Sequence, residues 1–269
     1  MSTGKAICYS KSMGQIKEQV RLDRLLANSG YGTRNDVKAL IHAGLVTVNG
    51  VPAERADIHV HLSKDKIQVD GQMLKVAIHV YYMMNKPSGY VCSSKGGANP
   101  TVFDLLEDAD KGRRLGGELS IVGRLDLDTE GLLILTTDGD LNHKLTSPKH
   151  HVPKTYFVQL ENRVSETEQK QYAEAVASGV EIPPEDHEPG AVCRGGKLEW
   201  ESSDNCRLTI YEGLYHEVKR IFKTLGNRVT YLKRISMNNL ALDPALDPGK
   251  YRELSEQELS ALTLTNAIL

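Results

Sequence analysis

Charged side chains that could do acid–base or nucleophilic chemistry are concentrated just before the apolar run Leu132–Leu135. They are Arg124, Asp126, Asp128 and Glu130. If this segment is extended, Arg124, Asp126 and Asp128 point to the same side of the strand. Asp126 could then act as a nucleophile or a general base, or the two Asp residues could simply cap a loop. The residues by themselves leave both interpretations open.

The regions around this segment predict a sheet flanked by helices. Apolar and β-branched runs predict strands at residues 80–85, 131–137, 156–160 and 207–210. Helices are predicted after Ser165 and Ser255, which open capping boxes, and over residues 216–225, whose apolar side chains recur at helical spacing. Residues 183–189 form an acidic loop that we expect at the surface. Because no strict βα repeat is present, the pattern favours an α+β domain with a mixed, mainly antiparallel sheet.

A smaller basic module precedes this region. The spacing of Leu22, Leu25 and Leu26 predicts a helix that ends near Gly30. A second helix is expected to begin after Thr33, as an N-cap, and to end near Gly44. Two strands follow, at residues 46–48 and 66–69, and Asn49-Gly50 predicts a tight hairpin turn after the first of them. Residues 1–42 carry seven basic and three acidic side chains, so this end of the chain suits a phosphate-rich partner.

Composition narrows the class of protein further. The chain has 269 residues, with 40% hydrophobic and 25% charged side chains, which predicts one large or two modest globular domains. No apolar run is long enough for a membrane helix, and the first residues lack an apolar leader, so we expect a cytoplasmic protein without a membrane partner. The cysteines, whose spacing does not suggest a metal site, are expected to be free thiols rather than a Cys193–Cys206 disulfide: Cys8, Cys92, Cys193 and Cys206.

Residues 20–68 resemble the RNA-binding module found in small-subunit ribosomal protein four and in many RNA-modifying enzymes. The second helix of that module usually starts with Ser-Arg, and here Thr33-Arg34 keeps the hydroxyl cap and the arginine. The resemblance implies that Arg21, Arg34 and Lys38 bind RNA phosphates. The other interpretation is a solvated basic surface.

A second resemblance covers the larger region. GRLDLDTEGLLILTTDGD (residues 123–140) resembles the signature of the RsuA-type pseudouridine synthases, which isomerise uridine in ribosomal RNA. Three further segments match that family in order: MNKPSGYVCS, TSPKHHVPKTYFV and EGLYHEVKRIFKTLGNRV. The reaction detaches uracil from ribose, turns it and rejoins it through a ring carbon, so it needs no cofactor and no metal. The resemblance therefore implies an isomerase with the pseudouridine synthase fold.

The resemblance also implies roles for individual residues. Asp126 matches the catalytic aspartate, and Lys219 matches its ion-pair partner, a position where many family members have arginine. The adjacent Arg220 is an alternative partner or an RNA contact. Tyr156 matches the active-site tyrosine, which can stack on uracil or relay a proton. The competing interpretations are a solvated helix face for Lys219 and a half-buried strand position for Tyr156.

Arg124 matches the arginine that can fill the gap left by an extruded nucleotide, unless it forms a structural pair with Asp128 or Glu130. Val229 could line the base pocket or belong to the core. For His143, His150 and His151, contacts to RNA or to backbone are expected in preference to acid–base chemistry. Residues 205–235 carry seven basic and two acidic side chains, which predicts a second phosphate-binding surface.

Together these observations predict a monomeric enzyme that modifies ribosomal RNA, most specifically the 16S RNA of the small subunit or an assembling small subunit. The alternatives are a 23S RNA enzyme of the same family, a non-catalytic ribosome-assembly factor, and a glycoside hydrolase that uses Asp126 and Asp128. The expected organisation is a flexible arm (1–19), the RNA-binding module (20–70), a linker (71–79), the catalytic domain (80–262) and a tail (263–269).

Overall fold

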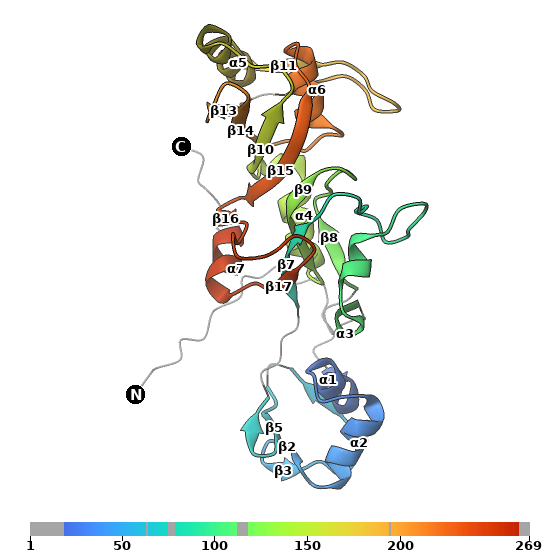
Figure 1. Cartoon of the computed structure of the whole chain (residues 1–269). Coiled ribbons are helices and arrows are strands. Elements are labelled where there is room, and N and C mark those ends of the chain that lie inside the picture. Colours follow the sequence, from blue (N-terminus) through green and yellow to red (C-terminus); the bar gives the residue numbers. More distant parts are fainter. Residues whose placement is uncertain (1–18, 63, 75–78, 112–117, 194, 264–269) are drawn as a thin grey trace. The chain divides into compact units, whose positions relative to one another are not determined.

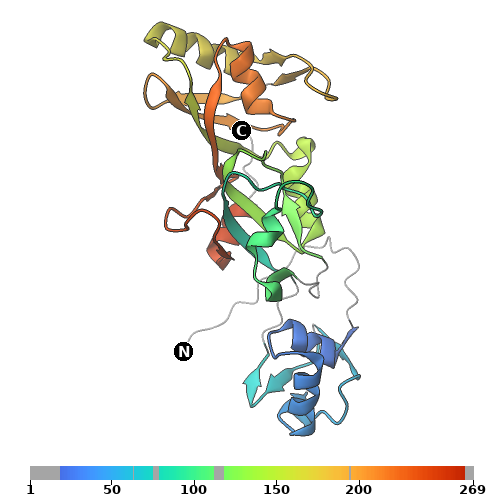
Figure 2. The same ribbon diagram turned by 45° about the vertical axis from the view of Figure 1, so that its right-hand side comes forward.

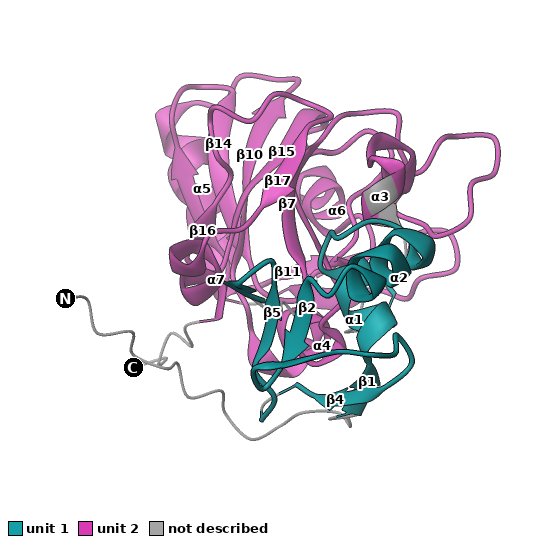
Figure 3. Cartoon of the chain, turned by 90° about the horizontal axis from the view of Figure 1, so that it is seen from below, with its two compact units in different colours: residues 1–79, 113–118 teal, residues 80–112, 119–269 magenta. Residues whose placement is uncertain are grey.

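The computed structural model describes residues 19–62, 64–74, 79–111, 118–193 and 195–263 (Figure 1). The chain divides into two compact units, one with residues 1–79 and 113–118 and the other with residues 80–112 and 119–269 (Figure 3). Of the arm expected over residues 1–19 only Gln19 is described, and of the tail only Thr263. None of the described helices combines the length and apolar composition needed to cross a membrane.

The first unit contains two helices, α1 (Leu22–Asn28) and α2 (Arg34–His42). The predicted stripe of Leu22, Leu25 and Leu26 is confirmed, because these side chains are fully buried in the core of this unit. Thr33 caps α2 as predicted. Asp36 completes a capping box, since its carboxylate accepts from the Thr33 backbone N–H at 2.7 Å while the Thr33 hydroxyl accepts from the Asp36 N–H at 3.3 Å.

Two small sheets complete this unit. Its strands are β1 (Gln19–Arg21), β2 (Val46–Val48), β3 (Val51–Pro52), β4 (His59–His61), β5 (Ile67–Val69) and β6 (Gln72–Met73). β1 pairs with β4, and the other four form a sheet in the order β3-β2-β5-β6. Asn49 and Gly50 both have positive φ, as the predicted hairpin turn requires. β6 lies inside the segment expected as a linker, so the sheet extends beyond residue 70.

The second unit is built on a nine-stranded sheet. Its strands are β7 (Tyr81–Lys86), β8 (Ser120–Val122), β9 (Glu130–Thr136), β10 (Lys154–Leu160), β13 (Lys197–Trp200), β14 (Asn205–Ile210), β15 (Val229–Met237), β16 (Leu240–Ala241) and β17 (Tyr251–Glu253). The main path is β13-β14-β10-β15-β9-β7-β17, with β16 beside β15 and β8 beside β9. Only β9 and β15 pair in parallel among these strands. The predicted mixed, mainly antiparallel sheet is therefore confirmed.

Helices cover this sheet, and a separate hairpin lies beside them (Figure 2). The helical segments are η1 (Val102–Leu105), α3 (Asp108–Lys111), α4 (Gly139–Thr146), η2 (Pro148–His150), α5 (Glu166–Ser178), α6 (Glu217–Thr224) and α7 (Glu256–Thr263). The hairpin consists of β11 (Val180–Ile182) and β12 (Ala191–Cys193), and the predicted acidic loop joins its strands. α5 packs on β13, while α6 packs on β11 and β15, so α6 connects the hairpin to the sheet.

The parallel contact between β9 and β15 depends on a glycine. Gly131 has a φ of +100° and lies opposite Arg234 in the register. A Cβ atom at Gly131 would lie 2.3 Å from the Arg234 carbonyl oxygen, so any side chain would push the two strands apart. This close approach brings β15 against the start of β9, which directly follows the Asp126 segment.

Candidate active site

Asp126 and Asp128 lie on the loop between β8 and β9. The loop is a turn rather than the extended segment considered from the sequence, because the Thr129 N–H donates to the Asp126 carbonyl at 3.2 Å. Leu125 is buried in the core, and its N–H donates to the Cys92 sulfur at 3.4 Å. The apolar side chain thus anchors the loop while the two carboxylates stay partly exposed, at 28% and 66% of their side-chain surface.

Lys86, at the end of β7, binds the backbone of this loop. Its side chain is fully buried, and the ammonium donates to four backbone carbonyls: those of Pro87, Asp126, Leu127 and Thr129. Burial lowers the pKa of Lys86, opposed by the negative charges of Cys92 and the nearby carboxylates. This role could not be predicted from the sequence, because three of the four carbonyls lie about forty residues from Lys86.

Lys219, in the first turn of α6, is the cation that faces the carboxylates. Its Nζ lies 3.3 Å from Asp126 Oδ2 and 2.6 Å from Asp128 Oδ1. Burial acts to lower the pKa of Lys219, but the hydrogen bond to Asp128 and the charge of Asp126 outweigh it and raise that pKa. The same contacts hold the pKa of Asp128 below its usual range against the effect of burial. Lys219 is therefore not on a solvated helix face.

Tyr156 reaches the same region through the sheet. It lies on β10, where it pairs with Arg234 of β15, which in turn pairs with Gly131 of β9. Tyr156 is only 7% exposed, and burial raises its pKa although the Arg234 charge acts in the opposite direction. The Asp126 charge also contributes to this shift, so the two side chains share one electrostatic environment.

Arg234 is a second buried cation that sequence reasoning missed. It is 1% exposed, and its guanidinium donates to the carbonyls of Leu132 at 2.8 Å and Gly123 at 3.2 Å. These contacts fix both ends of the loop that carries Asp126. Alternation along β15 could have placed Arg234 on an inner face, but not the carbonyls that satisfy it.

Arg220 requires a correction. The side chain is 1% exposed, and its guanidinium donates to the carbonyls of Pro183, Pro189 and Tyr215. It faces away from the carboxylates that Lys219 contacts, as neighbouring helix positions do. A buried guanidinium with these partners is not available to RNA phosphates, so the structure assigns Arg220 to the anchoring of the β11–β12 loop.

Arg124 and Val229 are the next two residues whose predicted roles can be compared with the structure. Arg124 is exposed, and it does not form the structural pair considered above, because Asp128 contacts Lys219 and Glu130 accepts a hydrogen bond from Tyr231 at 2.7 Å. Val229 is half-buried and packs against the core.

Residues 205–235 expose fewer unpaired cations for phosphate binding than their charge count predicted. Arg220 and Arg234 are buried, and most of the remaining cations are engaged by carboxylates. Arg207 contacts Glu201, and Arg228 contacts Glu161.

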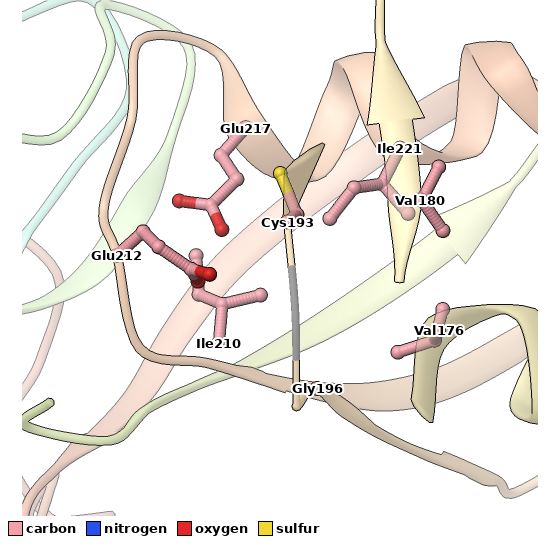
Figure 4. Close-up of a pocket in the computed structure, with 8 residues that line it drawn as sticks. All are labelled: Val176, Val180, Cys193, Gly196, Ile210, Glu212, Glu217 and Ile221. Atoms are coloured by element: carbon pink, nitrogen blue, oxygen red, sulfur yellow. The ribbon is translucent and has the colours of Figure 1, made fainter. Parts of the chain in front are cut away.

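Glu217, the first residue of α6, lies close to Glu212 of the preceding loop. Glu217 is 2% exposed and accepts from the Leu214 N–H at 2.7 Å. It faces Glu212 across a small cavity that Cys193 and apolar side chains line (Figure 4). Burial raises the pKa of Glu217, and the charge of Glu212 adds to this effect. Nearby, burial lowers the pKa of Lys154 to about 8.

His216, just before α6, also belongs to the site. Its Nδ1 lies 2.6 Å from Glu185 Oε1, and its Nε2 lies 3.8 Å from Asp126 Oδ1. Neither His216 nor Glu185 was predicted from the sequence to be a site residue. Only the structure shows that His216 has a left-handed backbone and that Glu185 lies beside it.

Comparisons with known proteins identify this arrangement. The family model described as RNA pseudouridylate synthase matches residues 80–224, and the S4 domain model matches residues 20–67. The chain belongs to the RNA pseudouridine synthase family. It is 44% identical to an uncharacterized RNA pseudouridine synthase of Bacillus subtilis, over 90% of this chain and 98% of that protein. It is 37% identical to ribosomal small subunit pseudouridine synthase A of Haemophilus influenzae, over 90% of this chain and 99% of that protein.

A solved structure supports the same assignment. The chain is similar to a crystal structure of a pseudouridylate synthase with a TM-score of 0.60 and 36% identity, over 90% of this chain and 99% of that one. The predicted RsuA-type membership and the isomerase activity on RNA are thereby confirmed. Within the described ranges, this pseudouridine synthase has no group of three His, Cys, Asp or Glu side chains arranged for a metal. The described cysteines are free and buried: Cys92, Cys193 and Cys206.

Proposed function

We propose that this pseudouridine synthase isomerises one uridine in small-subunit (16S) ribosomal RNA, with Asp126 as the catalytic residue. The observation that carries the proposal is the placement of Asp126 on a clamped loop, 3.3 Å from the Lys219 ammonium. The relatives support the RNA target, because those of Haemophilus influenzae and Escherichia coli, at 37% and 36% identity, are named ribosomal small subunit pseudouridine synthase A.

The geometry suits the first chemical step. The carboxyl group of Asp126 can attack as a nucleophile or remove a proton, and the Lys219 ammonium lies 3.3 Å from it. Lys86 and Arg234 hold the backbone on either side of Asp126, so little reorganisation is needed when substrate binds. Tyr156 lies on the buried side of the site, where its ring would stack on the uracil or its hydroxyl would form a hydrogen bond with it.

The uridine must leave its stack to reach Asp126. Extrusion costs a few kcal/mol, which contacts made only in the flipped state must offset. Arg124 is exposed on the same loop, two residues before Asp126, and its planar guanidinium can stack in the vacated position. We therefore assign base flipping to this loop.

The first unit supplies phosphate contacts. Arg21, Arg34 and Lys38 are exposed, and Arg21 is held by two hydrogen bonds from its guanidinium to the buried Asp23. These side chains would bind ribosomal RNA or an assembling small subunit, with the enzyme acting as a monomer.

The other functions considered from the sequence are less well supported. A glycoside hydrolase needs one carboxyl with a raised pKa, whereas the pKa of Asp128 is lowered and it shares Lys219 with Asp126. An assembly factor without activity has no use for the clamped Asp126, and family membership assigns the chain to the enzymes.

The remaining alternative, a 23S target, is tested by incubating the protein with unmodified small-subunit and large-subunit RNA in parallel. Pseudouridine is then mapped in both RNAs. We expect one modified position, in the small-subunit RNA. Modification confined to the large-subunit RNA would contradict the proposed target.

A further inference from the structure

His216 occupies a backbone conformation that needs an explanation. It is the residue before α6, with φ and ψ of 49° and 26°, and its side chain does not cap the helix. A non-glycine residue in the left-handed region is uncommon and costs about 1 kcal/mol or more. The conformation places the imidazole between two other elements, the β8–β9 loop and the β11–β12 loop.

Two contacts fix the orientation of the ring, and a hydrogen bond holds the tyrosine on which it stacks. Nδ1 lies 2.6 Å from Glu185 Oε1, and the ring stacks on Tyr215 with centroids 3.8 Å apart and planes at 22°. The Tyr215 hydroxyl donates to Asp186 at 2.9 Å. The loop that carries both acids is itself anchored, because Arg220 donates to carbonyls at its two ends. The remaining ring nitrogen, Nε2, therefore has a fixed direction, and it faces Asp126 Oδ1 at 3.8 Å.

Acidic side chains lie on both sides of the ring. Nδ1 faces Glu185, and Nε2 faces Asp126. The charged groups that surround His216 are Asp126 and Asp128 from the β8–β9 loop, Glu185 and Asp186 from the β11–β12 loop, and Lys219, Arg220 and Lys223 from α6. Because Arg220 is turned to backbone carbonyls, four carboxylates face only two ammonium groups.

We propose that His216, held by Glu185, is a positioning residue that fixes the Oδ1 side of the Asp126 carboxylate while Lys219 holds the Oδ2 side. This inference rests on the proposed function of Asp126. At 3.8 Å the ring nitrogen is beyond hydrogen-bond distance, so His216 limits the space into which Oδ1 can turn, while Lys219 Nζ lies 3.3 Å from Oδ2. Displacement of a reacting group by about 1 Å can cost roughly a hundredfold in rate, so restricting the rotation of this carboxyl group is expected to matter for the reaction.

The test compares three variants with the wild type. His216→Asn keeps a residue that tolerates positive φ but removes the imidazole ring. Glu185→Gln removes the acid that orients the ring, and Glu188→Gln, an exposed residue of the same loop, is the matched control. The single-turnover rate is followed on saturating unmodified small-subunit RNA by tritium release from the uracil carbon that forms the new bond. RNA affinity is measured separately, and thermal melting checks folding.

We expect His216→Asn to be slower by roughly 10- to 100-fold with unchanged RNA affinity. Glu185→Gln should also be slower, by a smaller factor and with unchanged RNA affinity, because the ring loses the carboxylate that orients it. Glu188→Gln should behave as wild type.

A His216→Asn enzyme at the wild-type rate would overturn the proposal, as would a slower variant whose RNA affinity falls in the same proportion. Either result, with Asp126→Asn inactive, would leave the proposed function intact. An active Asp126→Asn enzyme would instead defeat the proposed function itself.

Discussion

The buried ammonium of Lys86 lies 3.0 Å from the backbone carbonyl oxygen of Asp126. One side chain thus secures the main chain of the β8–β9 loop, while a different lysine, Lys219, faces the Asp126 carboxylate. Backbone position and side-chain charge are controlled by separate residues, so substitutions can probe them separately.

Lys86→Met tests the backbone contact. The substitution removes the donor for four carbonyls, some of which would stay buried without a partner. We expect the free energy of unfolding to fall by about 2–4 kcal/mol, together with a loss of activity. Urea unfolding measures the change, and the exposed Lys64→Met is the control. A Lys86→Met protein as stable as the control would show that the loop does not depend on this ammonium.

Lys219→Met tests the charge. The substitution removes the ammonium that contacts both Asp126 and Asp128, so we expect the single-turnover rate to fall roughly 100- to 1,000-fold with little change in stability. Lys219→Arg keeps the charge and should recover part of the rate. The exposed Lys170→Met on α5 serves as the control. Equal rates for the Met and Arg variants would show that charge is not what Lys219 contributes.

Glu217→Gln tests the buried carboxyl pair. Because the pKa of Glu217 is raised in the folded protein, the native state binds more protons than the unfolded chain above pH about 4.5, and stability falls as the pH rises. Glutamine mimics the protonated form, so the variant should match wild type near pH 4.5 and exceed it by about 1–3 kcal/mol near pH 8. Unfolding curves across this range give the difference. A constant difference at every pH would contradict the raised pKa.

Arg34→Ala tests the RNA-binding module. Arg34 is exposed in the first turn of α2, so its removal should weaken RNA binding and reduce the slope of log affinity against log salt by about one. Arg55→Ala is the matched control, because Arg55 is an exposed arginine of the same unit that we do not assign to RNA binding. If both variants have the same salt slope, Arg34 does not contact a phosphate.

Local patterns predicted most elements of the fold. The leucine stripe of α1, the Thr33 cap and the Asn49-Gly50 turn are decided by neighbours in the sequence, so they could be read from it. The ordered family motifs brought Asp126 and Lys219 together, and the structure places them in contact.

The supporting residues could not be predicted in the same way. Lys86, Arg234 and Arg220 are buried cations, and most of the carbonyls that they contact lie about 30 to 110 residues away in the sequence. Because every residue has a backbone carbonyl, no residue type marks these partners. A count of charges therefore placed Arg220 and Arg234 on a surface, although both are buried.

The most direct test of the account compares Asp126→Asn with Asp128→Asn, since both carboxylates contact Lys219 and differ in their proposed roles. Pseudouridine formation and RNA affinity are measured for each variant on unmodified small-subunit RNA. We predict that Asp126→Asn binds this RNA as wild type does but forms no pseudouridine, whereas Asp128→Asn still completes the reaction. Pseudouridine formed by the Asp126→Asn enzyme would contradict the central claim.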